Sequence, residues 1–302
     1  MKYFSLFSGI GGFELGIQQA YENKTRCDSN QQKIQTEQAN VEYMPSDFRK
    51  NVYSTPRCVG YSEIDKYAIA TYQSHFPEHK NYGDITKINE QELPDFDMLV
   101  GGFPCQAFSI AGKRKGFEDT RGTLFFDIAR IIKAKQPRLV FLENVKGLLS
   151  HDNGETFRTI IATLDELGYD LQWQVLNSKN HGVPQNRERV FIIGHLRGTS
   201  RPEVFPFTIN GGKDIVQLFG GSQSERVYSR KGVSSTLSTM QGGNLQPKVF
   251  EERRIRRLTP IECERLQGFP DNWTVGSDTQ RYKQCGNAVT VNVIRDIAER
   301  LL

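Results

Sequence analysis

The sequence predicts an α/β protein in which a mostly parallel, doubly wound sheet is joined to a second, smaller β-rich lobe. Apolar, β-rich runs alternate with helical segments up to Gly194, which is typical of a parallel sheet covered by helices. This alternation then stops, and residues 195 to about 255 are rich in Gly, Ser, Thr, Pro and Arg. The chain of 302 residues, 37% hydrophobic and 25% charged, is long enough for both units.

The elements of the sheet domain follow from the apolar runs and from helical periodicity. The expected strands are Lys2–Phe7, Val59–Ser62, Phe96–Gly101, Arg138–Leu142, Asp170–Leu176 and Arg189–Ile193. The expected helices are Gly12–Tyr21, Lys66–His75, Leu124–Lys135 and Thr156–Leu167. In the third of these helices the apolar side chains recur at the spacing of one buried face, namely at Leu124, Ile128, Ile131 and Ile132.

The later part of the chain contains weaker signals. Short β-like pieces at Glu225–Tyr228 and Thr236–Thr239 indicate strands in the small lobe. Helical character returns at Pro260–Gln267 and again near the C-terminus. There, apolar residues recur every four positions, at Val289, Val293, Ile297 and Leu301. We expect this last helix to pack back on the sheet.

A discontinuous domain follows from that expectation. Residues 1–194 and 280–302 are predicted to form the sheet domain, and residues 195–279 the small lobe with its hinge. The polar, Gln- and Asn-rich segment 22–58 shows no pattern of its own and is predicted to be an insertion.

Composition excludes several classes of protein. The five cysteines form no CxxC pair and leave an odd one over, which favours a reducing, cytoplasmic compartment over a disulfide framework. His75 and His79 are separated by Pro77, so we predict no metal site. Glycines and Glu14 interrupt the apolar N-terminus, so neither a signal peptide nor a membrane span is expected.

Charge is distributed unevenly along the chain. Residues 195–260 contain eleven Lys and Arg against five Asp and Glu, a local excess larger than the net charge of +4 for the whole chain. Such a basic segment suits a polyanion such as nucleic acid, and a solvated surface explains it equally well.

Three short motifs suggest a nucleotide-like ligand. FSLFSGIGGFELG is a strand, a glycine-rich turn and a helix, an arrangement that lets backbone approach a ligand closely. YSEID places Glu63 just past a strand, where its carboxylate can accept hydrogen bonds from ribose hydroxyls. GDI places Asp84 after another turn, where it suits an adenine amino group or simply caps a helix. Each motif alone is also compatible with a purely structural turn.

The stretch GGFPCQAFS presents a single cysteine directly after a proline, at the end of a predicted strand. Ligands bind at this edge of open α/β sheets, so Cys105 is a candidate nucleophile. The alternative is a buried cysteine that acts as a small hydrophobic residue.

Charged side chains follow at two more predicted strands. LENV places Glu143 and Asn144 after an apolar run, and QNRERVFIIG places Arg187 and Arg189 on one face of a strand. The arginines could hold an anion or support a carboxylate. Polar strand ends and a solvated sheet edge would explain the same residues.

Taken together, the chain resembles the DNA cytosine-5 methyltransferases of bacteria and phages, of the type II restriction-modification type. The resemblance covers essentially the whole chain except 22–58 and most of 200–250. The motifs that carry it, in family order, are FSLFSGIGGFELG, YSEIDKYA, GDIT, GGFPCQAFS, RGTLFFDIARII, FLENVKGL, QNRERVFIIG, RLTPIECERLQGFPD and YKQCGNAV. It implies a Rossmann-like sheet that binds S-adenosylmethionine and a small target-recognition domain.

The resemblance also implies roles for individual residues. The cofactor would contact Phe7, Gly9, Gly11, Glu63, Ile64, Asp84, Ile85, Pro104, Asn287 and Val289. Cys105 would add to C6 of cytosine, and nearby positive charge is expected to help form its thiolate. Glu143 would hold the N3 and N4 edge and protonate N3, while Arg189 with Arg187 would orient the base and that carboxylate. A water is expected to remove the C5 proton.

Double-stranded DNA is the implied partner. The target base must be flipped out of the duplex, and the segment Ser109–Gly122 resembles the loop that closes over it. The residues expected to contact DNA are Gln106, Ser109, Arg121, Arg226, Arg230, Thr236 and Leu237. We expect a short, G·C-containing recognition site.

The implied biology is a monomer in the cytoplasm of a bacterium or of a phage-infected host, with no membrane partner and with a cognate restriction endonuclease acting separately. Two alternatives remain within the same architecture, a tRNA cytosine-5 methyltransferase and a catalytically silent DNA-binding relative. The basic segment favours DNA, and intact Cys105, Glu143 and Arg189 argue against a silent relative. A nicotinamide oxidoreductase is disfavoured because FxGxGG followed by PC and ENV is not its pattern.

Overall fold

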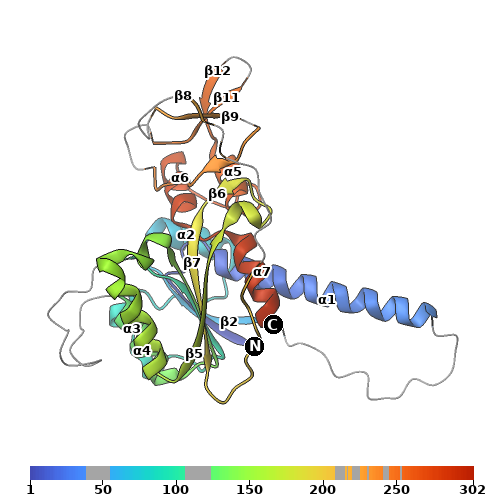
Figure 1. The fold of residues 1–302 in the computed structure, drawn as a ribbon, viewed down its shortest axis with the longest axis vertical. Coiled ribbons are helices and arrows are strands. Elements are labelled where there is room, and N and C mark those ends of the chain that lie inside the picture. Colours follow the sequence, from blue (N-terminus) through green and yellow to red (C-terminus); the bar gives the residue numbers. More distant parts are fainter. Residues whose placement is uncertain are drawn as a thin grey trace.

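The computed structural model describes residues 1–38, 55–105, 124–207, 215, 217–219, 225–229, 231–240, 245–251 and 254–302. A central sheet with helices on both faces forms the larger part of the molecule, and a small β-rich lobe lies at one end (Figure 1). The predicted α/β fold class is therefore confirmed.

The central sheet of the described chain has six strands in the order β2-β1-β3-β4-β7-β5. The bounds are β1 Lys2–Leu6, β2 Arg57–Ser62, β3 Met98–Gly102, β4 Leu139–Val145, β5 Tyr169–Asn177 and β7 Glu188–Leu196. Strands β2, β1, β3 and β4 are parallel, whereas β7 runs antiparallel to both β4 and β5. All six strands were predicted, although β4 and β7 extend three residues further than expected at one end.

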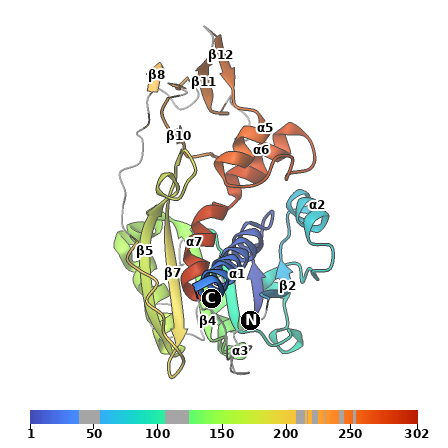
Figure 2. The same ribbon diagram turned by 90° about the vertical axis from the view of Figure 1, so that its right-hand side faces the viewer.

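Helices cover both faces because successive residues of each strand point to opposite sides. On one face Leu99, Val140 and Ile192 pack with α3 (Leu124–Lys135) and α4 (Glu155–Glu166). On the other face Val100, Phe141 and Ile193 pack with α1 (Gly12–Gln38) and α7 (Val291–Leu301). Figure 2 shows α1 and α7 beside each other on that face. The predicted return of the last helix to the sheet is confirmed.

Helix α1 is much longer than predicted. It continues from Tyr21 through the segment expected to be a patternless insertion, ends at Gln38, and extends away from the sheet (Figure 1). The residues beyond Tyr21 include good helix formers such as Glu, Lys and Gln but no apolar stripe, so periodicity gave no signal. The other end of that segment also belongs to the sheet, since β2 begins at Arg57.

The C-terminal part holds three helices, α5 (Pro260–Leu266), α6 (Asp278–Asn287) and α7. Val289 lies between α6 and α7, although the four-residue spacing placed it in the last helix. Val293, Ile297 and Leu301 do lie on the buried face of α7. Helix α2 (Lys66–His75) matches its predicted bounds.

The small lobe contains a sheet in the order β12-β11-β9-β8. Its strands are β8 Gln217–Phe219, β9 Val227–Ser229, β11 Lys248–Glu251 and β12 Arg254–Arg257. A separate parallel pair joins β10 (Ser234–Ser235) to β6 (Gln185–Asn186). The expected strand at Thr236–Thr239 is wrong, because the regular pairing ends at Ser235.

The limits of the two domains stay a prediction. Val204 and Phe205 pack in the same core as α7, and Phe269 and Trp273 pack with Ile10 of the first turn. These contacts favour counting residues 195–207 and 269–279 with the sheet rather than with the lobe.

Candidate active site

The candidate site residues come together at one edge of the central sheet. Parallel strands end at the same edge, so the residues after β2, β1 and β3 lie side by side, and Glu143 of β4 is in register with Gly102 of β3. Strand β7 is antiparallel and begins where β4 ends, which pairs Arg189 with Val145. The edge thus brings together Glu63, the turn 7–11, Cys105, Glu143 and Arg189.

Cys105 lies on a loop that is held from the neighbouring strand. Asn144, which is 1% exposed, donates from Nδ2 to the carbonyl of Phe103 at 2.9 Å. Pro104 is exposed and Cys105 is partly buried against the core. Asn144 was not predicted as a site residue, although its place in LENV beside Glu143 gave the signal.

The electrostatics of Cys105 differ from the expectation. Partial burial raises the pKa of its thiol above the ordinary value of 9.0, and burial is the cause of the shift. The positive charge expected to favour the thiolate is not supplied by the residues that the structure describes.

Glu143 and Arg189 form a buried ion pair. Arg189 donates from Nε to Oε1 of Glu143 at 3.0 Å, and their side chains are 17% and 9% exposed. Burial raises the pKa of Glu143, while the positive charges of Arg189 and Arg187 act in the opposite direction. The outcome is a carboxyl group that holds a proton more readily than a carboxyl in water.

Gly102 makes room for this carboxylate. A Cβ atom on Gly102 would lie 3.0 Å from Oε2 of Glu143 and 3.4 Å from Cγ1 of Val289. Oε1 is taken by Arg189, so Oε2 is the carboxylate oxygen beside the strand end that leads to Cys105.

Glu63 braces the glycine-rich turn. Its Oε2 accepts from the N–H of Gly9 at 2.9 Å, and its Oε1 accepts from the N–H groups of Ile64 and Asp65 at 2.8 Å each. The turn is tight, because Phe7 and Gly9 have φ values of 52° and 56°. The carboxylate is therefore held firmly at the end of β2.

Open space borders this turn. A Cβ on Gly9 or on Gly83 would meet nothing within 4 Å. Ile64 is 72% exposed, which is unusual for so apolar a side chain. The hydroxyl of Ser8 is buried without a hydrogen-bond partner among the described residues. An exposed apolar side chain, open backbone and an unpaired hydroxyl are features that a bound nucleoside would cover.

Asp84 and Ile85 have different surroundings. Asp84 caps the short 3₁₀ helix Ile85–Lys87, and hydrogen bonds from Thr86 hold the pKa of its carboxyl below the ordinary value. Ile85, expected to contact the cofactor, is 3% exposed and its side chain packs in the core with α3. The expected contact of the Ile85 side chain with the cofactor is corrected, because the side chain that follows the Asp84 cap points into the apolar core.

The C-terminal residues of the site lie at the end of α6 and directly after it. Asn287 is exposed at the end of α6. Val289 packs between the start of α1 and β3, since a Cβ on Gly12 would lie 2.6 Å from its Cγ2. Val289 thus lies against both the start of α1, after the glycine-rich turn, and the strand that carries Gly102.

Arg187 lies in a position different from the one expected. Its guanidinium donates from Nη1 to the carbonyl of Leu237 at 3.2 Å, and from Nη2 to the carbonyls of Gly286 and Ala288 at 3.2 and 2.8 Å. It is 3% exposed, and burial lowers the pKa of Arg187 to about 9. Its influence on Glu143 is electrostatic, and Arg189 alone of the two forms the ion pair.

The predicted DNA contacts divide into three groups. Thr236 and Arg226 are exposed. Leu237 is 1% exposed and packs with Met240 and Leu258, so its side chain is not at a DNA-facing surface, and that expectation is corrected. The remaining predicted contacts lie outside the described residues, and so does the predicted closing loop Ser109–Gly122. These contacts are Gln106, Ser109, Arg121 and Arg230.

The described residues contain neither a helix suited to a membrane nor a cluster suited to a metal ion. No described helix is both long and apolar enough to cross a membrane. Within the same ranges, no group of three or more His, Cys, Asp or Glu is placed to hold a metal ion.

Known proteins are similar to this chain over nearly its whole length. The family model for C-5 cytosine-specific DNA methylase matches residues 1–220 and 215–302. The type II methyltransferase M1.ScrFI of Lactococcus lactis subsp. cremoris is 39% identical, over 100% of this chain and 78% of its own length. The type II methyltransferase M.HhaI of Haemophilus parahaemolyticus is 37% identical, over 99% of this chain and 93% of its own.

A solved structure has the same fold at lower identity. The crystal structure of S. pombe Dnmt2 methyltransferase superposes with a TM-score of 0.69 at 15% identity, covering 100% of this chain and 98% of that one.

Proposed function

This chain belongs to the C-5 cytosine-specific DNA methylase family and is a DNA cytosine-5 methyltransferase, and we propose that it acts through a covalent adduct between Cys105 and C6 of the target base. One observation carries this mechanism. The loop that presents Cys105 and the Glu143–Arg189 pair lie at the same edge of the sheet, bonded through Asn144.

S-adenosylmethionine fits the other half of this edge. The firmly held Glu63 carboxylate suits ribose hydroxyls, exposed Ile64 suits a face of adenine, and Asp84 suits its amino group. Open backbone at Gly9 lets a ligand approach the turn closely. Gly11, Pro104 and Asn287 complete the proposed pocket with Phe7 and Val289, and bound S-adenosylmethionine would supply the methyl group.

Cytosine C5 needs activation before it can accept a methyl group. The thiolate of Cys105 would add to C6, which makes C5 enamine-like and nucleophilic. Once C5 has received the methyl group of S-adenosylmethionine, loss of the C5 proton to a water and departure of the Cys105 thiolate would restore the aromatic ring. Partial burial holds the thiol protonated in the free protein, so thiolate formation would accompany binding of the base.

Glu143 and Arg189 would prepare the base for attack. A carboxyl with a raised pKa can hold the proton that N3 receives, and protonation at N3 makes C6 more electrophilic. Arg189 fixes Oε1, which leaves Oε2 to face the base edge. Because a cytosine inside a duplex cannot reach this edge, we propose that it is flipped out, at a cost of a few kcal/mol.

The small lobe would select the site. We propose that Thr236 and Arg226 are among its DNA contacts, that the enzyme acts as a monomer in the cytoplasm, and that a separate endonuclease cleaves the same site when unmethylated. The type II names of M1.ScrFI and M.HhaI support this last proposal.

The test is methylation of unmethylated genomic DNA by purified protein with S-adenosylmethionine, read by bisulfite sequencing, with tRNA in parallel. Protected cytosines within one short DNA motif are expected. Methylation confined to tRNA would overturn the assignment of DNA as substrate. Absence of methylation on both DNA and tRNA would overturn the assignment of an enzymatic activity.

A further inference from the structure

The segment Ser234–Met240 joins the small lobe to the sheet domain, and two buried side chains bond the backbone of Leu237. The N–H of Leu237 donates to Oε1 of Gln185 at 3.0 Å. Its carbonyl accepts from Nη1 of Arg187 at 3.2 Å. Gln185 and Arg187 are 0% and 3% exposed, so both bonds are shielded from water.

Neighbouring contacts fix the register of the same segment. Strand β10 pairs in parallel with β6, so that Ser234 lies opposite Gln185 and Ser235 opposite Asn186. The Thr236 hydroxyl then donates to the carbonyl of Asn186 at 2.6 Å. A one-residue slip would break both the ladder and the two bonds to Leu237.

Gly286 of α6 supports the segment from the other side. A Cβ on Gly286 would lie only 2.0 Å from the carbonyl oxygen of Ser238. The backbone after Leu237 therefore rests directly on α6, and only glycine allows so close an approach.

The clamp, meaning the bonds of Gln185 and Arg187 to the backbone of Leu237, is made by side chains that come just before Arg189 in the sequence. Arg187 is two residues before Arg189, which pairs with Glu143. The Arg187 guanidinium also bonds the carbonyl of Ala288, directly before Val289. The recognition segment, the Glu143 carboxylate and the C-terminal part of the cofactor edge thus share one support.

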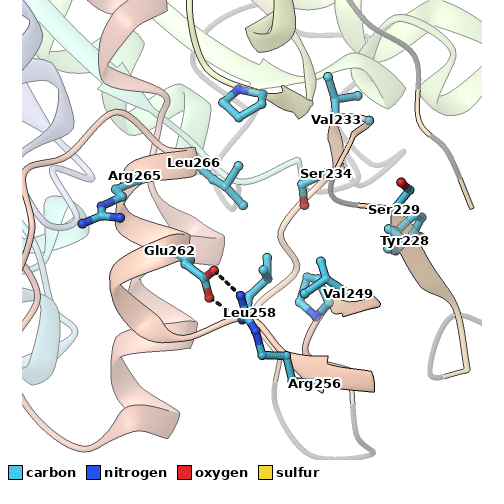
Figure 3. A pocket seen from close by; sticks show the side chains of 13 residues that line it. Tyr228, Ser229, Val233, Ser234, Val249, Arg256, Leu258, Glu262, Arg265 and Leu266 are labelled. Atoms are coloured by element: carbon cyan, nitrogen blue, oxygen red, sulfur yellow. Dashed lines mark hydrogen bonds and ion pairs between the residues drawn. The ribbon is translucent and has the colours of Figure 1, made fainter. Parts of the chain in front are cut away.

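Side-chain packing alone does not hold the segment. A cavity of about 270 Å³ lies between α5 and the small lobe, and Ser234, Leu258 and Leu266 are among its lining residues (Figure 3). On the lobe side, Arg256 pairs with Glu262 of α5 through two bonds of 2.8 and 2.9 Å. The Leu237 side chain packs in an apolar cluster, and the bonds of Gln185 and Arg187 add a fixed position for its backbone N–H and carbonyl.

We propose that Gln185 and Arg187 are positioning residues that hold the backbone of Leu237 in register with the Glu143–Arg189 pair. Discrimination between the recognition site and near-cognate sites depends on this clamp. The proposal rests on the DNA methyltransferase function given above. It assigns Gln185 a role in fidelity although Gln185 does not contact the reacting atoms.

The experiment compares wild type, Gln185→Met and Gln172→Met. Gln172 is a matched control, because its amide also bonds backbone, donating to the carbonyl of Pro202 and accepting from the N–H of Val204. It lies on β5, the outermost strand of the sheet, and does not contact Leu237. The kcat/KM is measured on a duplex with the site found by bisulfite sequencing and on duplexes with one base pair altered. Affinity for S-adenosylmethionine without DNA is measured by calorimetry.

The clamp predicts that Gln185→Met lowers the ratio of kcat/KM between cognate and altered duplexes about tenfold, because the buried N–H of Leu237 loses its acceptor. S-adenosylmethionine affinity should not change, and Gln172→Met should keep the wild-type ratio. An unchanged ratio in Gln185→Met would overturn the proposal, even if its turnover were lower.

A second variant covers the case in which Gln185→Met does not fold. Gly286→Ala pushes Ser238 from the opposite side and is expected to lower the same ratio, and an unchanged ratio there would overturn the proposal equally. Absence of DNA methylation by wild type would instead be a failure of the proposed function itself.

Discussion

Glu143 and Arg189 are joined by a 3.0 Å ion pair across two antiparallel strands, at the edge where the loop of Cys105 begins. Both side chains are largely buried, so the pair is poorly screened by solvent. This relationship explains how a carboxyl group can remain oriented although burial raises its pKa.

Replacing Arg189 by Met should leave Glu143 buried without its cation. Breaking a buried pair on one side costs about 3 kcal/mol or more, so both the free energy of unfolding and kcat/KM should fall, the latter by about 100-fold. Urea unfolding and methylation assays measure the two effects.

Arg158→Met is the matched control for this change. Arg158 pairs with Glu155 at 2.5 Å on an exposed helix face, so its loss should cost at most about 1 kcal/mol and leave turnover intact. Equal effects of the two substitutions would contradict a special role for the Glu143–Arg189 pair.

Gly102→Ala should displace the carboxyl group of Glu143 without removing any functional group. The new methyl would lie 3.0 Å from Oε2 of Glu143 and crowd Val289. We expect a fall in kcat of at least about tenfold, measured by single-turnover methylation. Gly147→Ala, where a Cβ meets nothing within 4 Å, should retain wild-type turnover, and full activity in Gly102→Ala would refute the close approach.

Glu14 should make stability depend on pH. This residue of α1 is 1% exposed, accepts from the hydroxyl of Tyr72 at 3.0 Å, and burial raises the pKa of its carboxyl from 4.5 to about 7. The native state therefore keeps a proton that the unfolded state releases above its own pKa. The resulting stability is fully present below pH 4.5 and is lost as pH rises through 7, up to about 3 kcal/mol.

Glu14→Gln imitates the protonated side chain and should remove that loss. The variant should be more stable than wild type at pH 8 and about equal at pH 4.5 in urea unfolding. Glu22→Gln, on the exposed part of the same helix, should leave the pH profile of wild type unchanged. A Glu14→Gln profile parallel to wild type would disprove the assignment.

Cys105 should react slowly as a free thiol. Because burial raises its pKa above 9.0, alkylation by iodoacetamide in the absence of DNA should still increase with pH beyond pH 9. Peptide mass spectrometry separates its rate from that of Cys27, which is exposed. A rate for Cys105 that levels off below pH 8 would show a thiolate already stabilised in the free enzyme.

The sequence predicted the fold well where burial follows a period. The β-rich runs of the sheet and helices such as Leu124–Lys135 bury one face each, and periodicity detects this. The extension of α1 to Gln38 was not predicted, because a polar helix has no apolar stripe for periodicity to detect. The antiparallel direction of β7 could not be read from an apolar run, which looks the same in either direction.

Residue type and motif place Cys105, Glu143 and Glu63 at one edge of the sheet, as the structure has them, while their roles stay predictions. The site was not predictable where tertiary contacts decide the direction of a side chain. Ile85 and Leu237 lie in motifs that resemble binding sites, yet both are buried in apolar clusters. Arg187 and Arg189 are two residues apart, and the sequence alone does not distinguish their surroundings. Only the fold shows that Arg187 bonds backbone carbonyls whereas Arg189 pairs with Glu143.

The most direct test of the covalent mechanism uses duplex DNA that carries 5-fluorocytosine at the target position found by bisulfite sequencing. Fluorine replaces the C5 hydrogen that a base must remove before the cysteine can depart, so the adduct should accumulate after methyl transfer. With S-adenosylmethionine present, we predict a denaturation-resistant complex attached to the peptide that contains Cys105, and none with Cys105→Ala, which should still bind S-adenosylmethionine. A crosslink at another residue, or turnover of ordinary DNA by Cys105→Ala, would contradict the account.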